Sequence, residues 1–421
     1  MKKRVSINVN TVTKYVLGRG KVEILIKNCR VVDDTRDFQG DIYVKDGKIA
    51  ECGKKLEYDC KTIKGDGLVA MPAFIDMHVH FRDPGYTYKE DIYTGSMAAL
   101  KGGYTLVNLM ANTKPICSSM EIVDYVLNKS KELNLIDLHQ IVSITKDFDG
   151  KTLYHLDSLD NRVKFISDDG KGVQSNLIMY KAMVKAKEKG LTIIEHTEDE
   201  GIVSVDTRLS ENIMTFRDIY LAKLTGARLH LAHVSTKESI EAIRKAKKCG
   251  TNITCEVTPH HISLYNEEYK VNPPIREKED VVAIIQGIKD GTVDVIATDH
   301  APHSEEDKEK ESPGISGIET AFSISYTTLV KTGEISLNRL SQIMSAVPGR
   351  LMEVNKGKIK TGYDGDIVLV DLDKKIKINK DKFISKGKNT PFNGKEFYGE
   401  VVATIKNGEI KYNGGIQVDN R

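Results

Sequence analysis

The chain has 421 residues, of which 40% are hydrophobic and 29% are charged. This composition is ordinary for a globular protein with a sizeable core, and the length predicts one large domain and one smaller domain. The 62 basic and 60 acidic residues leave a net charge of +2, so the charge balance predicts neither a nucleic-acid partner nor a membrane partner.

The six cysteines are scattered without a C-x-x-C spacing. This pattern argues against a structural zinc knot and against a secreted disulfide framework. No apolar segment is long enough for a membrane-spanning helix, and the basic N-terminus is not followed by the apolar core of a signal peptide. We therefore expect a cytoplasmic protein.

Both ends of the chain predict short β-strands, after a polar extension over residues 1–20. Turn signals such as Asp46-Gly47 separate the strand segments. The predicted strands cover residues 22–26, 41–44, 48–51, 366–371, 401–405 and 409–412. Neither end has enough strands to close a core, so we expect residues 21–72 and 356–421 to pair into one small β-sandwich domain.

The middle of the chain, residues 73–355, alternates between buried strands and amphipathic helices. Helical patterns over residues 177–189 and 237–248 each end in a basic turn followed by a glycine. The predicted strands cover residues 74–81, 104–110, 138–144, 163–167, 191–196, 228–234, 252–258 and 293–298. Eight strands joined by helices predict an α/β fold, the (β/α)8 barrel of the TIM type.

Polar residues stand at the C-terminal ends of five of these strands, the end at which such barrels build active sites. They are His78, His80, the pair Asp168-Asp169, His196, His233 and Asp299. Imidazole and carboxylate groups are typical ligands of zinc. We therefore expect two divalent cations of the zinc kind, with one carboxylate placed to bridge them.

Strand parity separates neighbouring candidates, because successive side chains of a strand point to opposite faces. His233 shares a face with Leu231, whereas His230 takes the opposite face and is expected under the helices. By the same rule only one of Lys164 and Asp169 faces the metals if their strand is regular.

Other polar residues near the strand ends are candidates for substrate binding. Arg82 offers a planar fork for a carboxylate. Asn112 and Asn272 suit amide groups of a substrate, although Asn272 is equally consistent with a simple turn before two prolines. His303 follows close to Asp299, and the charged segment 304–312 is either solvated surface or a mobile lid.

Several longer motifs contain these residues: F-I-D-M-H-V-H-F-R-D-P-G, S-D-D-G-K-G-V-Q, A-H-V-S-T-K-E-S, E-V-T-P-H-H, N-P-P and A-T-D-H-A-P-H. Together they resemble the dihydroorotases of the amidohydrolase superfamily, in the bacterial class that carries an aspartate-aspartate-glycine segment on the fourth strand. The resemblance covers nearly everything after the first twenty or so residues.

The resemblance implies two zinc ions, with Asp169 as the bridge, and the ligands His78, His80, Asp169, His196, His233 and Asp299. It implies substrate contacts from His80, Arg82, Asn112, Asn272, His303 and the backbone of Pro313 and Gly314. Related enzymes use a carboxylated lysine as the bridge, and Lys164 stands about where that lysine falls. The aspartate-aspartate-glycine context favours Asp169.

The implied activity is the reversible cyclisation of N-carbamoyl-L-aspartate to L-dihydroorotate in pyrimidine biosynthesis. The substrate is a small anion held by Arg82, and Asp299 is the expected proton shuttle. The rival interpretations are a hydantoinase, dihydropyrimidinase or allantoinase, which prefer uncharged rings, and a non-catalytic homologue that acts as a structural partner, for instance of a transcarbamoylase. A homodimer and an association of the active enzyme with a transcarbamoylase are further expectations.

Overall fold

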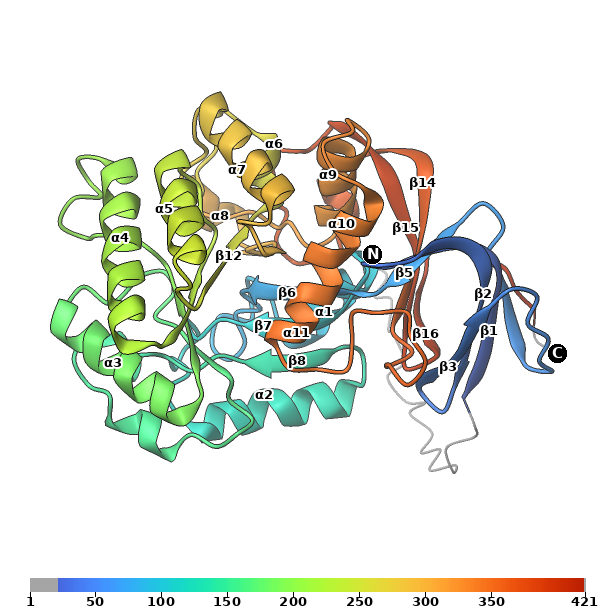
Figure 1. The fold of residues 1–421 in the computed structure, drawn as a ribbon, viewed down its shortest axis with the longest axis horizontal. Helices are drawn as coiled ribbons and strands as arrows, with labels where there is room; N and C mark the ends of the chain where they lie inside the picture. The colour runs from blue at the N-terminus through green and yellow to red at the C-terminus, as the bar shows by residue number, and fades with distance from the viewer. Residues whose placement is uncertain (1–21, 420–421) are drawn as a thin grey trace, which may run out of the picture.

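A computed structural model describes residues 22–419 (Figure 1). A barrel of parallel strands takes up the middle of the chain, and a β domain built from both ends stands at its side (Figure 1). The barrel strands are β6 (Phe74–Val79), β7 (Tyr104–Leu109), β8 (Asp137–Gln140), β9 (Phe165–Ile166), β10 (Thr192–Glu195), β11 (Arg228–Leu231), β12 (Ile253–Val257) and β13 (Val295–Ile296). The predicted extension over residues 1–20 lies outside the described residues.

The barrel closes through parallel pairing alone. β6, β7 and β8 form one sheet, and β9 to β13 form the other in chain order. Single parallel bridges join the two sheets, from Val142 to Ile166 and from Val79 to His300. The predicted (β/α)8 barrel is therefore confirmed, and each predicted strand segment contains a strand.

Several strands end earlier than the sequence predicts, because the backbone leaves the ladder where the polar residues begin. β11 ends at Leu231 and β13 ends at Ile296. Beyond them, His233 and Asp299 have φ values of +31° and +46°, in the region that residues other than glycine rarely adopt. His233 and Asp299 thus stand beyond the ends of their strands at the mouth of the barrel, whereas His78 lies within β6.

Helices cover the outside of the barrel (Figure 1). Their bounds are α1 (Ile92–Lys101), α2 (Met120–Leu133), α3 (Asn176–Lys189), α4 (Thr207–Thr225), α5 (Lys237–Lys248), α6 (Pro259–Ser263), α7 (Lys278–Asp290), α8 (Glu305–Glu309), α9 (Ala321–Ser325), α10 (Leu337–Ser341) and α11 (Val347–Leu351). Both helices predicted with a glycine stop are present as α3 and α5, and Ser175 and Thr236 cap their N-termini. Within residues 22–419, no helix combines the length and the apolar character that a membrane span requires.

The small β domain contains strands from both ends of the chain. They are β1 (Glu23–Val32), β2 (Asp37–Lys45), β3 (Lys48–Gly53), β4 (Lys61–Lys64), β5 (Val69–Pro72), β14 (Ile367–Lys377), β15 (Glu396–Lys406), β16 (Glu409–Asn413) and β17 (Val418–Asp419). The two ends meet where β14 pairs antiparallel with β5, with Ile367 opposite Pro72. The ends of the chain therefore pair as the sequence analysis expects.

The nine strands of this domain form one branched sheet rather than two separate ones. Branching occurs at β1, whose first half pairs with β4 and whose second half pairs with β5. Apolar side chains from both chain ends form its core, including Ile26, Ile42, Leu369 and Ile405. The predicted domain limits at residues 72 and 356 remain predictions.

Candidate active site

A cavity of about 230 Å³ lies at the C-terminal ends of the barrel strands. Its lining includes the predicted residues His80, Arg82, Asn112, Asp169, His196, His233, Asn272, Asp299, His303, Pro313 and Gly314. His78 is fully buried on β6 and lies within 3.6 Å of Asp299. The structure thus brings every predicted site residue together at one end of the barrel.

Asp169 stands at the centre of the four histidines. Its Oδ1 lies 3.4 Å from His78 Nε2, 3.5 Å from His233 Nε2 and 3.7 Å from His196 Nδ1. Its Oδ2 lies 3.5 Å from His80 Nε2. The two oxygens therefore face different histidines, which is the placement that a carboxylate bridging two cations requires.

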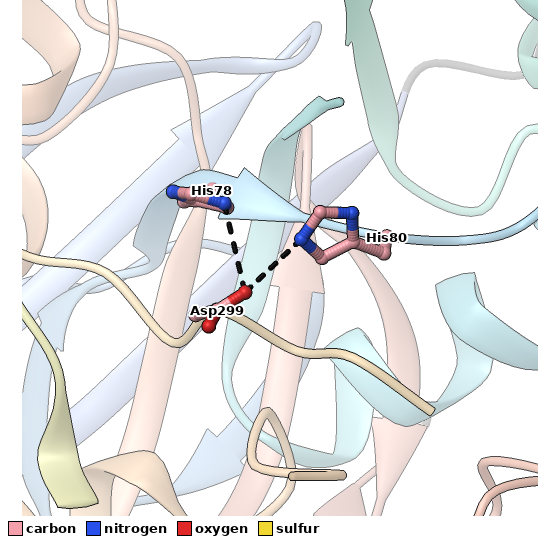
Figure 2. Close-up of side chains that lie close together, drawn as sticks. All are labelled: His78, His80 and Asp299. Carbon is pink, nitrogen blue, oxygen red and sulfur yellow. Dashed lines mark hydrogen bonds and ion pairs between the residues drawn. The ribbon is translucent and has the colours of Figure 1, made fainter. Parts of the chain in front are cut away.

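Asp299 completes a second group with His78 and His80 (Figure 2). Its Oδ1 is 3.0 Å from His80 Nε2 and 3.6 Å from His78 Nε2. In this group, and in the group of His78, Asp169 and His233, the potential ligand atoms all lie within 4.8 Å of one another. Each set could hold a cation, but His78 Nε2 has one lone pair and would bind only one of them, so the other cation would need the remaining donors around Asp169.

Hydrogen bonds on the far side of the rings fix which nitrogen faces the site. His78 Nδ1 lies 2.6 Å from the carboxylate of Glu256, and His80 Nδ1 lies 2.8 Å from Asn112 Oδ1. A neutral imidazole that donates from Nδ1 keeps the lone pair of Nε2 free. Both Nε2 atoms are directed at the carboxylates. Burial disfavours a charged His78 ring, but Asp169 and Glu256 raise the pKa of His78 well above its usual value, and a bound metal ion would take the place of the proton on Nε2.

Burial and charge compete over the carboxylates of the site. Burial by itself would raise the pKa of Asp169, but the adjacent imidazoles of His78 and His233 hold that pKa well below its usual value. Burial also acts to raise the pKa of Asp299, whereas the hydrogen bond with His80 and the charge of His78 keep it low. Both carboxylates are therefore ionised at neutral pH.

Two predictions about neighbouring residues are resolved by the geometry. Lys164 precedes β9, so it lies at the opposite end of that strand from Asp169, and its Nζ is 2.6 Å from Glu353. Lys164 therefore does not reach the histidines.

The placement of His230 under the helices is wrong, because its Nε2 is 3.1 Å from Glu256, the residue that also binds His78. Parity failed because β11 ends before His233, so alternation does not extend to that residue.

Positive charge gathers on one wall of the cavity. Arg82 Nη2 lies 3.3 Å from His303 Nε2, and Lys89 Nζ lies 3.4 Å from His303 Nδ1. Burial and these two cations lower the pKa of His303 to about 3, so its ring is neutral. A neutral imidazole has one acceptor nitrogen, so it cannot accept from both cations at once. This wall is electrostatically suited to an anion.

Two loops complete the lining of the cavity. Asn272 Nδ2 donates to Glu198 Oε2 at 2.7 Å, and Glu198 is also 3.5 Å from His196 Nε2. Pro313 and Gly314 follow the charged segment 304–312, which contains the short helix α8 capped by Ser304. Lys308 of this segment donates to the carbonyl of Ser312 at 2.7 Å. The charged segment is thus tied to the cavity wall, and its role as a mobile lid stays a prediction.

Comparison with known proteins places the chain in a family. The amidohydrolase family matches residues 69–411. Dihydroorotase from Clostridium botulinum is 57% identical over 396 residues, which cover 93% of this chain and 100% of that protein. Dihydroorotase from Bacillus subtilis is 40% identical over 421 residues, which cover 93% of this chain and 98% of that protein.

The chain belongs to the dihydroorotases of the amidohydrolase family. Among solved structures, the L-hydantoinase (dihydropyrimidinase) from Arthrobacter aurescens has a TM-score of 0.84 at 25% identity, and the match covers 93% of this chain and 96% of that one. The D-hydantoinase (dihydropyrimidinase) from a Thermus species has a TM-score of 0.82 at 26% identity, covering 94% and 97%. The fold of this chain is therefore similar to that of these two hydantoinases.

Two carboxylates of this dihydroorotase were missed by the sequence analysis. Glu256 on β12 orients His78, and Glu198 links His196 to Asn272. Glu256 carries a signal in the sequence, because it is a charged residue inside an apolar strand. A buried carboxylate needs a partner. Glu198 carries a weaker signal, its position two residues after His196.

Proposed function

We propose that this member of the dihydroorotases interconverts N-carbamoyl-L-aspartate and L-dihydroorotate, with two zinc ions and with Asp299 as the proton carrier. The main support is the position of Asp169, whose two oxygens face four buried histidines at the mouth of the barrel. The substrate is a small anionic molecule, and the reaction in the hydrolytic direction breaks a cyclic amide C–N bond.

The donor set fits the proposed cations. His78 Nε2 and Asp169 Oδ1 are buried and have no hydrogen-bond partner in the described part of the chain, although they lie only 3.4 Å apart. Buried polar atoms without a partner are costly, so these two atoms are suited to a ligand that they share. The residues that would hold two zinc ions are His78, His80, Asp169, His196, His233 and Asp299. When bound, such ions polarise a carbonyl and lower the pKa of a water.

Asp299 is the proposed carrier of the proton. In the ring-opening direction a water oxygen adds to the carbonyl carbon of the cyclic amide, the C–N bond breaks, and the ring nitrogen takes up a proton. Asp299 lines the cavity and is ionised, so its carboxylate can accept the proton of the water and pass it to the nitrogen. Ring closure uses the same steps in reverse.

Arg82 is the proposed contact for the carboxylate of the substrate. Its Nε is buried without a hydrogen-bond partner among residues 22–419, and its guanidinium stands beside neutral His303. A carboxylate placed there would satisfy both Arg82 and the ring of His303. Asn112, Asn272 and the backbone of Pro313 and Gly314 line the remaining walls and are the proposed contacts for the rest of the substrate.

A direct test combines metal analysis with substrate comparison. Purified enzyme is expected to contain close to two zinc ions per chain and to hydrolyse dihydroorotate far faster than dihydrouracil, hydantoin or allantoin. A preference for the uncharged rings would instead support one of the other cyclic amidohydrolases. Metal-free, inactive protein would support the non-catalytic interpretation, against which the presence of all six proposed ligands argues.

The cellular setting of the enzyme remains a set of proposals. We retain a cytoplasmic location, a homodimer and an association with a transcarbamoylase as expectations. Sedimentation of the purified chain, alone and mixed with the transcarbamoylase of the same organism, tests both assemblies. A single monomeric species in both samples would contradict them.

A further inference from the structure

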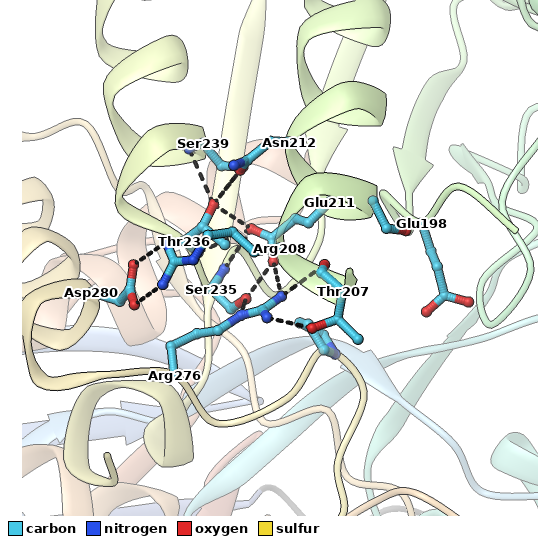
Figure 3. A network of polar contacts seen from close by, with 12 residues as sticks. Glu198, Thr207, Arg208, Glu211, Asn212, Ser235, Thr236, Ser239, Arg276 and Asp280 are labelled. Atoms are coloured by element: carbon cyan, nitrogen blue, oxygen red, sulfur yellow. Dashed lines mark hydrogen bonds and ion pairs between the residues drawn. The ribbon is translucent and has the colours of Figure 1, made fainter. Parts of the chain in front are cut away.

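A buried polar network lies behind two loops of the active site (Figure 3). We call it the Glu211–Arg276 network; it consists of Thr207, Glu211, Ser235, Thr236 and Arg276. Glu211 and Arg276 are only 3% and 8% exposed. Neither of them lines the 230 Å³ cavity, so the network has no direct contact with a substrate there.

Glu211 on α4 binds the backbone that follows β11. Its Oε1 accepts from the backbone N–H groups of Ser235 and Thr236, each at 3.0 Å. The hydroxyl of Thr236 donates to Oε1 at 3.1 Å, and the hydroxyl of Ser235 donates to Oε2. Charge-assisted bonds of this kind are among the strongest in proteins. One carboxylate therefore fixes two consecutive peptide units.

These peptide units begin two residues after His233. His233 has a φ of +31°, a conformation that costs free energy in a residue other than glycine and persists only where the surroundings enforce it. Its Nε2 must nevertheless stand 2.9 Å from His196 Nδ1 and 3.5 Å from Asp169. The bonds from Glu211 supply the constraint immediately after this strained residue.

Arg276 connects the same carboxylate to the loop that carries Asn272. Its Nη2 donates to Glu211 Oε2 at 3.1 Å, its Nε donates to Ser235 Oγ at 2.9 Å, and its Nη1 donates to Thr207 Oγ1 at 2.8 Å. Arg276 follows Asn272 by four residues, with two prolines between them. The planar guanidinium thus ties the Asn272 loop to the His233 loop and to the start of α4 (Figure 3).

The network is packed closely against the site. A small cleft beside the main cavity is lined by His196, His233 and Asn272 together with Thr207 and Glu211. Glu211 is hydrogen-bonded to the backbone that follows His233, and Arg276, which follows Asn272, is bonded to Glu211. A shift of the Glu211–Arg276 pair would therefore move both loops.

We propose that Glu211 and Arg276 are positioning residues that hold His233 and Asn272 in fixed relation, so that zinc affinity and substrate affinity depend on the same buried ion pair. Loss of the pair would displace a metal ligand and a substrate contact together. The effect on zinc affinity can be measured without turnover, whereas the effect on substrate affinity rests on the proposed function.

Arg208 offers a matched control in the same region (Figure 3). Like Glu211, Arg208 extends from α4, and it donates to Asp280 Oδ1 at 2.9 Å and to Glu238 at 2.6 Å. It contacts Glu277 as well, so it joins α4 to the segment that begins α7. Its side-chain partners within residues 22–419 are Glu238, Glu277 and Asp280, which lie outside residues 272–276 and outside residues 233–236.

The test measures three quantities on Arg276→Met, Arg276→Lys, Glu211→Gln and Arg208→Met. They are the melting temperature, the affinity of the metal-free protein for Zn²⁺ by chelator competition, and the steady-state kinetics (KM and kcat) with dihydroorotate. For Arg276→Met we expect zinc affinity to fall about 10-fold and KM to rise by a similar factor. Arg276→Lys is expected to recover part of both effects, since an ammonium can reach Glu211 but cannot form the fork.

Arg208→Met is expected to lower the melting temperature while zinc affinity and KM stay within twofold of the parent. If Arg276→Met shows this same pattern, the network is only structural and the inference is wrong. If Arg276→Met does not fold, Glu211→Gln decides, with parallel losses of zinc affinity and substrate affinity expected and unchanged values contradicting the inference. A parent enzyme that binds zinc but does not turn over dihydroorotate would overturn the proposed function and leave the zinc result standing.

Discussion

The mouth of the barrel and the layer of polar residues beneath it differ in how their hydrogen bonds are satisfied. In the lower layer Asp76 accepts from the backbone and the hydroxyl of Thr298, at 3.0 and 2.6 Å. Glu256 binds His78 with one oxygen and His230 with the other. At the mouth, by contrast, Asp169 Oδ1 and Arg82 Nε are buried without a hydrogen-bond partner in the described part of the chain.

His78 belongs to both layers and shows what the difference means. Its Nδ1 is bonded to Glu256 below, while its Nε2 faces the carboxylates above without a hydrogen bond among residues 22–419. An unsatisfied buried polar atom costs about 1–3 kcal/mol. The unpartnered atoms of His78, Asp169 and Arg82 gather at the mouth, where a bound ligand would satisfy them, and Glu256 in the layer below holds His78 in place. Substitutions in the two layers should differ accordingly.

The largest effect is expected for Asp299→Asn. The amide keeps the size of the side chain but cannot take up a proton, so turnover of dihydroorotate should fall by about 100- to 10,000-fold. Zinc content should remain largely intact, because five other proposed ligands persist. Steady-state kinetics and metal analysis measure both quantities. Full activity would remove the proton-carrier role, and loss of zinc would make Asp299 chiefly a ligand.

A smaller effect, on substrate affinity, is expected for Arg82→Met. A hydrogen bond to a charged group contributes about 1.5–3 kcal/mol, so KM for dihydroorotate should rise roughly 10- to 100-fold. KM for dihydrouracil, which lacks the carboxylate, should hardly change. Lys89→Met is a matched control, because Lys89 contacts the outer nitrogen of His303 and does not line the cavity. Equal effects of Arg82→Met on both substrates would contradict the carboxylate assignment.

In the satisfied layer, Glu256→Gln should act on the metal rather than on the substrate. Glutamine keeps one acceptor but loses the charge that orients His78, so zinc affinity should fall about 10-fold. Thr254→Val is the control, since Thr254 Oγ1 bonds His230 at 2.7 Å, one step further from His78. Chelator competition provides the measurement. Similar zinc affinities for both variants would show that the lower layer does not tune the site.

The barrel and most of the mouth could be predicted because the signals are local. Each strand is a short apolar segment, and each proposed ligand lies at the C-terminal end of one of them or just beyond it. His230 was misplaced because parity was extended past Leu231, where the strand ends. Alternation holds only while the backbone stays in the ladder.

The partners of the ligands could not be predicted from the sequence. Glu256 and His78 are 178 residues apart, and Arg276 and Glu211 are 65 apart. No spacing rule connects such pairs, because their contact follows from barrel closure and loop packing. A buried carboxylate in the sequence says that a partner exists but does not identify it.

The smallest effect is expected at the other end of β9, where Lys164 was the alternative bridge. Lys164 and Arg228 both pair with Glu353 on the surface, at 2.6 and 3.3 Å. Exposed ion pairs contribute about 0–1 kcal/mol, so Lys164→Met should leave zinc content and turnover within twofold and should resemble Arg228→Met. If Lys164→Met alone lost zinc, and a small carboxylate added to the solution restored it, the bridge would be a modified lysine. The central ligand at the mouth of the barrel would then be Lys164 rather than Asp169, and the contrast with the satisfied layer beneath would have to be drawn from that residue.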